Sequence, residues 1–138
     1  MDYINIFPTT LGTKTLNYIP DKYISKCKEY ILNSPLEPLK DEKLNDFVTK
    51  DKSLLESQIF KNLKKDILYY SKKYTDHIGI TVEDLQFGKS WAVIVNPNNN
   101  LNNYHSHKNS LISGCFYLTY GGDINFKSNF YQDLYYFR

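Results

Sequence analysis

The hydrophobic period of the chain changes once, near Tyr74, and this change limits the folds that the chain can adopt. Before that point apolar residues recur at three- and four-residue steps, which is typical of amphipathic helices. After it they alternate with polar residues, which is typical of strands with one buried face. The sequence therefore predicts an α+β domain in which helices come first and an antiparallel sheet follows.

Two helices are expected in the first half of the chain. The first begins after Pro20, a residue tolerated at the first helical position, and ends near Asn33. The second begins at Ser53, where Ser53 and Glu56 fit a capping box, and its apolar stripe continues to Tyr74. Residues 1–19 are expected to be extended, and the mostly polar residues 34–52 are expected to form a loop.

Alternating apolar residues predict several strands after Tyr74, over residues 78–82, 85–87, 91–95 and 111–120. Pro97 and the three asparagines after it predict a turn, and Gly121-Gly122 predicts another before a strand that begins at Asp123. The strand over residues 111–120 has two expected faces. One carries Ile112, Gly114, Phe116 and Leu118, and the other carries Ser113, Cys115, Tyr117 and Thr119.

The size and charge of the chain exclude several classes of protein. Its 138 residues make one domain. Seventeen basic residues against fifteen acidic ones leave a net charge of +2, too small to indicate nucleic acid or an anionic membrane as a partner. No apolar run reaches the roughly 18–20 residues of a membrane span, and no secretory signal begins the chain.

The two cysteines, Cys27 and Cys115, lie far apart and form no CxxC pair. A disulfide scaffold and a cysteine-based zinc site are therefore not expected, and a reducing cytoplasm is the simplest location. For a viral protein this is the cytoplasm of the host cell.

His105 and His107 flank Ser106 and account for two of the three histidines. Residues i and i+2 of a strand point to the same face, so both imidazoles can bind one metal ion. Imidazole suits iron, zinc, copper and nickel. The alternative is a pair of exposed histidines in a polar loop. The remaining histidine, His77, is expected to be exposed or to cap the end of the second helix.

The stretch from Trp91 through the His-x-His pair resembles the 2-oxoglutarate/Fe(II)-dependent oxygenases, in particular a group with many phage and marine bacterial members. The resemblance continues through Ser113-Gly114-Cys115-Phe116-Tyr117-Leu118 and the glycine turn to Phe126, and the opening segment 4–9 also resembles the family's usual start. Two positions depart from the pattern: Lys108 stands where the family usually has proline, and Phe116 replaces a tyrosine.

The resemblance implies an oxidoreductase with Fe(II) and 2-oxoglutarate as cofactors and ascorbate as an optional one. Such a hydroxylase decarboxylates 2-oxoglutarate to succinate and CO₂ while O₂ is used to hydroxylate a C–H bond. The related prolyl hydroxylases make a peptide or protein prolyl side chain the expected substrate. By resemblance, His105 and His107 bind iron, and Tyr117, with Ser113 on the same face, binds 2-oxoglutarate; Trp91 is expected to be structural.

The implied fold is a double-stranded β-helix, a jelly-roll barrel, behind supporting N-terminal helices. Residues 1–138 then form one oxygenase-like domain, with a helical part over 1–76 and a barrel part over 77–138. The family has a third metal-binding histidine and a basic partner for 2-oxoglutarate after this strand, but no histidine follows His107. A closed barrel needs about eight strands, so we expect this barrel to be incomplete at its C-terminus.

Three alternatives remain open from the residues themselves. A cupin-like metal-binding protein also carries a His-x-His pair, but the glutamate required four or five residues later is replaced by Leu111 and Ile112. A non-enzymatic β-rich interaction module would make the histidines incidental. For Tyr117, the alternative to 2-oxoglutarate binding is packing in the core.

Overall fold

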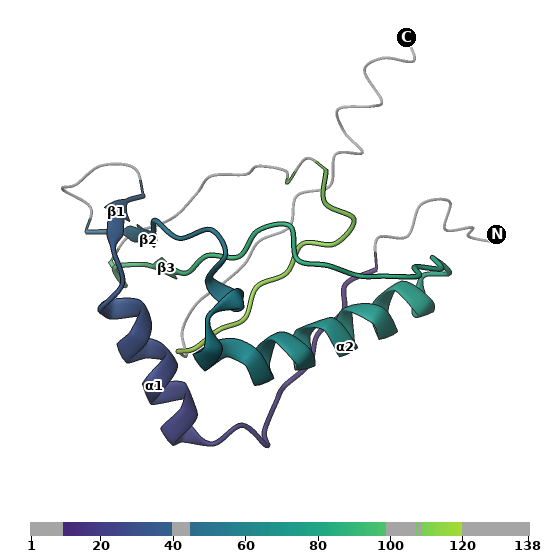
Figure 1. Cartoon of the computed structure of the whole chain (residues 1–138), viewed down its shortest axis with the longest axis horizontal. Helices are drawn as coiled ribbons and strands as arrows, with labels where there is room; N and C mark the ends of the chain where they lie inside the picture. The colour runs from purple at the N-terminus through teal and green to yellow at the C-terminus, as the bar shows by residue number, and fades with distance from the viewer. Residues whose placement is uncertain (1–9, 40–44, 99–106, 108, 120–138) are drawn as a thin grey trace, which may run out of the picture.

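The computed structural model describes residues 10–39, 45–98, 107 and 109–119 (Figure 1). In chain order its elements are α1 (Asp21–Leu32), β1 (Leu36–Pro38), β2 (Phe47–Thr49), the 3₁₀ turns η2 (Leu54–Glu56) and η3 (Gln58–Phe60), α2 (Lys61–His77) and β3 (Val93–Ile94). The mixture of helices with an antiparallel sheet is an α+β arrangement, as expected, but the expected order of helices first and sheet second is wrong, because β1 and β2 lie between α1 and α2. Among the described residues, no helix combines the length and the apolar character that crossing a membrane requires.

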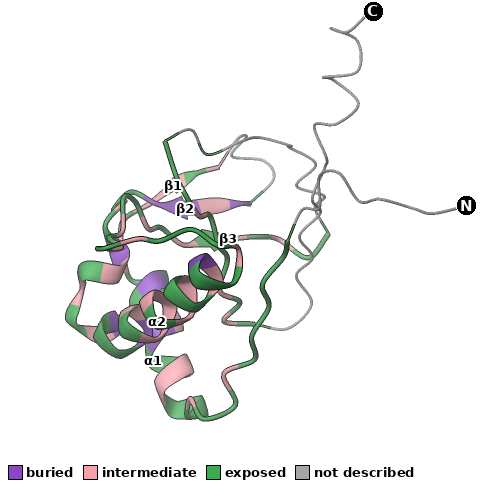
Figure 2. Ribbon diagram, turned by 90° about the vertical axis from the view of Figure 1, so that its right-hand side faces the viewer, coloured by how far each residue is buried: buried purple, intermediate pink, exposed green. Residues whose placement is uncertain are grey.

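The sheet has three short antiparallel strands in the order β1-β2-β3. β1 pairs with β2 from Leu36 opposite Thr49 to Pro38 opposite Phe47, and Phe47 also lies opposite Ile94 of β3. In both views the sheet lies above the two helices (Figures 1 and 2). The expectation of a loop over residues 34–52 is therefore wrong, because this segment supplies two of the three strands.

The first helix agrees with the sequence pattern. Pro20 precedes it in an extended conformation, and Cys27 and Ile31 are its buried residues. The helix ends where Asn33 donates its N–H to the Glu29 carbonyl. The stripe of apolar residues thus predicted both its extent and its inward face.

The second helix begins later than the capping box predicts. Ser57 is extended (φ −64°, ψ 140°) and separates η2 from η3, so the regular helix begins only at Lys61. Ser53 makes no side-chain capping hydrogen bond, and the Glu56 carboxylate pairs with Lys64 instead of reaching back. The capping-box prediction is therefore wrong: the Glu56 carboxylate pairs with an ammonium group on the helix that follows, and not with the backbone N–H of Ser53.

A small apolar core lies between the helices and the sheet. Its buried members are Cys27, Ile31, Leu54, Phe60 and Leu63. Figure 2 shows buried stretches of the ribbon in purple on the helices and the sheet. Side chains from distant segments pack against it, among them Ile94, Phe116 and Leu118. The core therefore joins both helices to β3 and to the segment that follows His107.

The described alternating segments after Tyr74 are mostly irregular in backbone structure, apart from β3. Of the predicted strands in the described part of the chain, only 91–95 contains a ladder strand, β3; 78–82, 85–87 and 111–119 contain none. The alternation predicts burial correctly at 85–87, where Leu85 and Phe87 are half-buried and Gln86 is exposed. It fails at 91–95, where Trp91, Val93 and Val95 are exposed and the intervening Ala92 and Ile94 pack against the core. Burial of one face needs only a packing partner, whereas a ladder also needs a neighbouring strand. The strand predicted from Asp123 lies outside the described residues.

The beginning of the described chain is fixed against α2. The Tyr74 hydroxyl donates a hydrogen bond of 2.7 Å to the Thr10 carbonyl. A Cβ atom on Gly12 would lie 2.9 Å from Cδ2 of the Tyr74 ring, so the close approach requires a glycine there.

Candidate functional site

His107 is the predicted metal ligand that the structure describes, and it lies beside Trp91. The two ring centroids are 5.6 Å apart, and the ring planes are inclined at 49°. Trp91 comes two residues before β3 and is partly exposed, and His107 is exposed. The start of β3 thus provides an aromatic surface against which the imidazole rests. His105 lies outside the described residues, so the spacing of the two imidazoles stays a prediction.

Residues 111–119 have the two faces that the alternation predicts. Phe116 and Leu118 pack against the core, and Ile112 is half-buried. Ser113, Cys115, Tyr117 and Thr119 are all exposed. The alternative that Tyr117 is a core side chain is wrong, because 45% of its surface is exposed.

Cys115 and Tyr117 form a polar pair on that exposed face. Desolvation around the sulfur raises the pKa of the Cys115 thiol above its ordinary value, and a hydrogen bond from Tyr117 lowers it in part. A raised pKa keeps the sulfur protonated near neutral pH, so Cys115 is a poor nucleophile and a poor metal ligand there. The hydroxyls of Ser113 and Tyr117 are the useful polar groups of this face.

The described residues do not by themselves make a complete metal site. Within residues 10–39, 45–98, 107 and 109–119, no three His, Cys, Asp or Glu side chains are placed to hold one ion. His107 is an acceptable imidazole ligand for iron, and its pairing with His105 at one metal ion stays a prediction.

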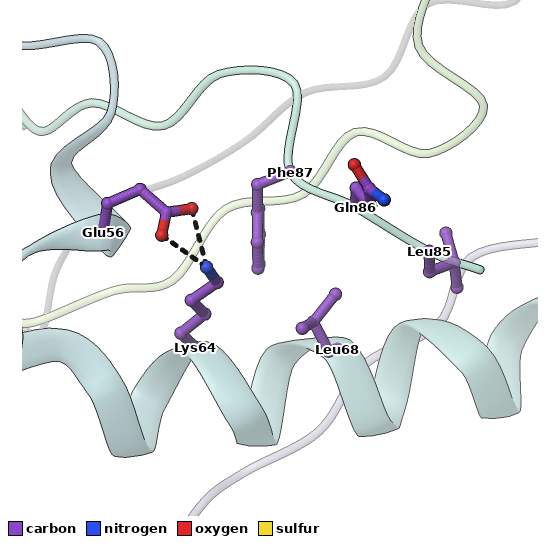
Figure 3. Close-up of a pocket in the computed structure, with 6 residues that line it drawn as sticks. All are labelled: Glu56, Lys64, Leu68, Leu85, Gln86 and Phe87. Atoms are coloured by element: carbon purple, nitrogen blue, oxygen red, sulfur yellow. Dashed lines mark hydrogen bonds and ion pairs between the residues drawn. The ribbon is translucent and has the colours of Figure 1, made fainter.

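A separate cavity of about 230 Å³ lies between α2 and the segment that contains Phe87 (Figure 3). The Lys64 ammonium contacts both oxygens of the Glu56 carboxylate at 2.6 Å and lies 5.9 Å from the centre of the Phe87 ring. Leu68, Leu85 and Gln86 complete the lining. The two charges satisfy each other, and none of the predicted site residues lines this cavity.

Asp46 is a buried carboxylate that the sequence pattern did not single out. Its Oδ1 accepts a 2.8 Å hydrogen bond from the Asn96 N–H, and its carbonyl accepts one from the Leu39 N–H. Its Oδ2 has no hydrogen-bond partner in the described structure. The side chain joins the start of β2 to the residue before Pro97, at the end of the sheet opposite Trp91. In the sequence Asp46 lies in a mostly polar stretch, where an aspartate is typical of a turn. No sequence signal therefore indicates that its side chain is buried.

No protein-family model matches the chain, and no curated protein or solved structure is significantly similar to it.

Proposed function

We propose that the chain is an Fe(II)- and 2-oxoglutarate-dependent dioxygenase that hydroxylates a C–H bond, with a peptidyl proline as the substrate class. The observation that carries this proposal is the two-faced segment 111–119. Phe116 and Leu118 hold its inner face on the core, while Ser113 and Tyr117 stand on the exposed face. A segment that binds a cosubstrate needs one face packed on the core and polar side chains on the other, exposed face.

The proposed metal ligands are His105 and His107. Trp91 supports the ring of His107, which limits the orientations that this imidazole adopts. A ligand whose ring is held in place by its surroundings binds a metal with less loss of entropy. Bound iron would supply the redox chemistry that couples decarboxylation of 2-oxoglutarate to hydroxylation.

The hydroxyls of Ser113 and Tyr117 are the proposed partners of a 2-oxoglutarate carboxylate. Each hydroxyl has one O–H to donate, and the O–H of Tyr117 would turn from the Cys115 sulfur to the carboxylate when 2-oxoglutarate binds. Hydrogen bonds to a charged acceptor are stronger than bonds between neutral groups, which favours this exchange. The alternating burial from Ser113 to Leu118 puts the two residues, four apart in sequence, on the same exposed side. The backbone between them is held by the packing of Phe116.

We further propose that the sheet is part of a jelly-roll barrel. The antiparallel order β1-β2-β3, with helices on one side, is compatible with one portion of such a barrel.

The test is Fe(II) binding by the full chain under anaerobic conditions, with and without 2-oxoglutarate. The readout is the weak visible charge-transfer band of the iron–keto-acid complex. We expect the band only when both components are present, and we expect it to vanish in the His105→Ala/His107→Ala variant. His77→Ala is the matched control, because His77 lies in the last turn of α2 and is not a proposed ligand.

Tyr117→Phe separates cosubstrate binding from metal binding. Loss of a hydrogen bond to a carboxylate is expected to weaken 2-oxoglutarate binding by about tenfold or more, with Fe(II) affinity unchanged. A folded wild-type chain that gives no band contradicts the proposed function.

A further inference from the structure

The outer edge of β3 carries backbone groups without partners in the described structure. The backbone N–H or C=O groups of Ser90, Ala92 and Asn96 point toward the β2 side. They form hydrogen bonds there with Lys52, Leu54, Thr49 and Asp46. Backbone groups alternate in direction along a strand. The N–H and C=O groups of Trp91, Val93 and Val95 therefore point away from β2, and no hydrogen bond of the described residues uses them.

The side chains of the same three residues form an exposed apolar row. Trp91, Val93 and Val95 are 38%, 43% and 42% exposed, whereas the intervening Ala92 and Ile94 pack against the core. Soluble proteins usually protect such an edge with a lysine, a proline or a charge within the strand. This row contains none of them; Lys89 and Pro97 stand two residues beyond its ends.

We propose that this edge pairs with the same edge of a second copy of the chain. Two β3 segments related by a twofold axis through Val93 form an antiparallel pair. Val93 then lies opposite Val93 of the partner subunit, and Trp91 lies opposite the partner's Val95. Each outward N–H and C=O group of the row gains a partner, and the two small sheets become one continuous sheet.

The charges favour this occupant. In the twofold register Lys89 lies opposite Pro97 of the partner subunit, so no like charges face each other along the pair. Every cross-strand pair within the row is apolar, which an arbitrary extended peptide does not guarantee. In the pair, the apolar side chains of the two copies contact each other laterally, which removes part of their surface from water on both copies. The pairing does not depend on iron or on 2-oxoglutarate.

The test is the mass of the full chain in solution, measured by sedimentation equilibrium without metal over a range of concentrations. We expect twice the monomer mass at high concentration. Val93→Lys places two ammonium groups opposite each other on the axis, and Val93→Glu does the same with carboxylates; each variant alone is expected to have the monomer mass. An equimolar mixture of the two is expected to regain the doubled mass, which excludes unfolding as the cause.

Leu32→Lys is the matched control, because Leu32 is an exposed apolar residue at the end of α1. It is expected to keep the doubled mass. A wild-type chain that stays monomeric overturns the proposal, whether its edge amides exchange freely or are protected by another part of the same chain. A doubled mass that survives Val93→Lys overturns it too, because the interface then lies elsewhere.

Discussion

Thr49 and Ala92 are joined by two hydrogen bonds of different kinds. The Thr49 N–H donates to the Ala92 carbonyl at 3.0 Å, and the Ala92 N–H donates to the hydroxyl of Thr49, Oγ1, at 3.1 Å. In a regular ladder the second bond would go to a carbonyl. Thr49 is fully buried, so its side chain supplies an acceptor that water cannot replace.

Thr49→Val is therefore expected to destabilise the protein by about 1–3 kcal/mol, because it leaves the Ala92 N–H without an acceptor. The measurement is the free energy of unfolding in urea. Thr75→Val is the control: Thr75 is equally buried, but its hydroxyl only donates to the Lys72 carbonyl, so no backbone N–H is orphaned. Equal losses in the two variants would show that the buried hydroxyl, and not the N–H of Ala92, determines the cost.

The Tyr23 hydroxyl ties α1 to η3 by donating a 2.8 Å hydrogen bond to the Ile59 carbonyl. Tyr23→Phe is expected to lower the free energy of unfolding by about 1 kcal/mol. Tyr30→Phe removes an exposed bond to Ser57 and is expected to have a smaller effect, because water replaces the lost partner. A loss of unfolding free energy in Tyr30→Phe as large as that in Tyr23→Phe would contradict this prediction.

The same tyrosine predicts a dependence on alkaline pH. Desolvation, followed by a hydrogen bond with Cys27, raises the pKa of Tyr23 from 10.0 to about 12. The fold then binds this proton more tightly than the unfolded chain does. The contribution is fully present below pH 10 and is lost as pH rises toward 12. We expect the stability gap between wild type and Tyr23→Phe to narrow over that window in urea titrations at each pH; a gap that widens there would contradict the assignment.

Trp91 offers an optical readout of His107, because it is the only tryptophan. A paramagnetic ion bound at an imidazole 5.6 Å away quenches indole emission efficiently. Titration with Co(II) is expected to quench the wild type and His77→Ala strongly and His107→Ala weakly. If His107→Ala is quenched as fully as the wild type, the ion binds at another site.

The ion pair between Lys64 and Glu56, in the cavity beside α2, is expected to contribute modestly to the free energy of unfolding. Lys64 is 29% exposed and Glu56 is 59% exposed, so solvent screens their attraction. Lys64→Met is expected to cost about 0.5–1 kcal/mol at low salt and less at high salt. Lys72→Met, which removes a longer and more exposed pair with Asp76, is expected to change stability by a few tenths of a kcal/mol at most. Unfolding curves at two salt concentrations check both values, and a loss independent of salt would point to the packing of the lysine stem.

Local pattern predicted the parts of the fold that depend on one face of one segment. The stripe through Cys27 and Ile31 located α1, and the alternation around Phe116 predicted which side chains face the core. The same alternation placed Ser113 and Tyr117 on one face, and the structure shows that this face is the exposed one. These features depend only on the backbone period and on the need to bury apolar surface.

Features that depend on a distant partner were missed. β1 and β2 have three residues each, too few to show a period, and they exist because Phe47 pairs with Ile94. The start of α2 was misplaced because Ser57 is extended and interrupts the helical run, so the regular helix begins only at Lys61. Asp46 was missed because its role depends on Asn96, fifty residues away in sequence.

The pairing of Phe47 with Ile94 also constrains how the protein assembles. Both 3₁₀ turns and the whole of α2 lie between these two residues. β2 and β3 therefore meet only after a long loop has closed, and that closure reduces chain entropy before any ladder bond compensates for it. The helices and the nearby pair β1–β2 can form from local contacts, so we expect β3 to join the fold last.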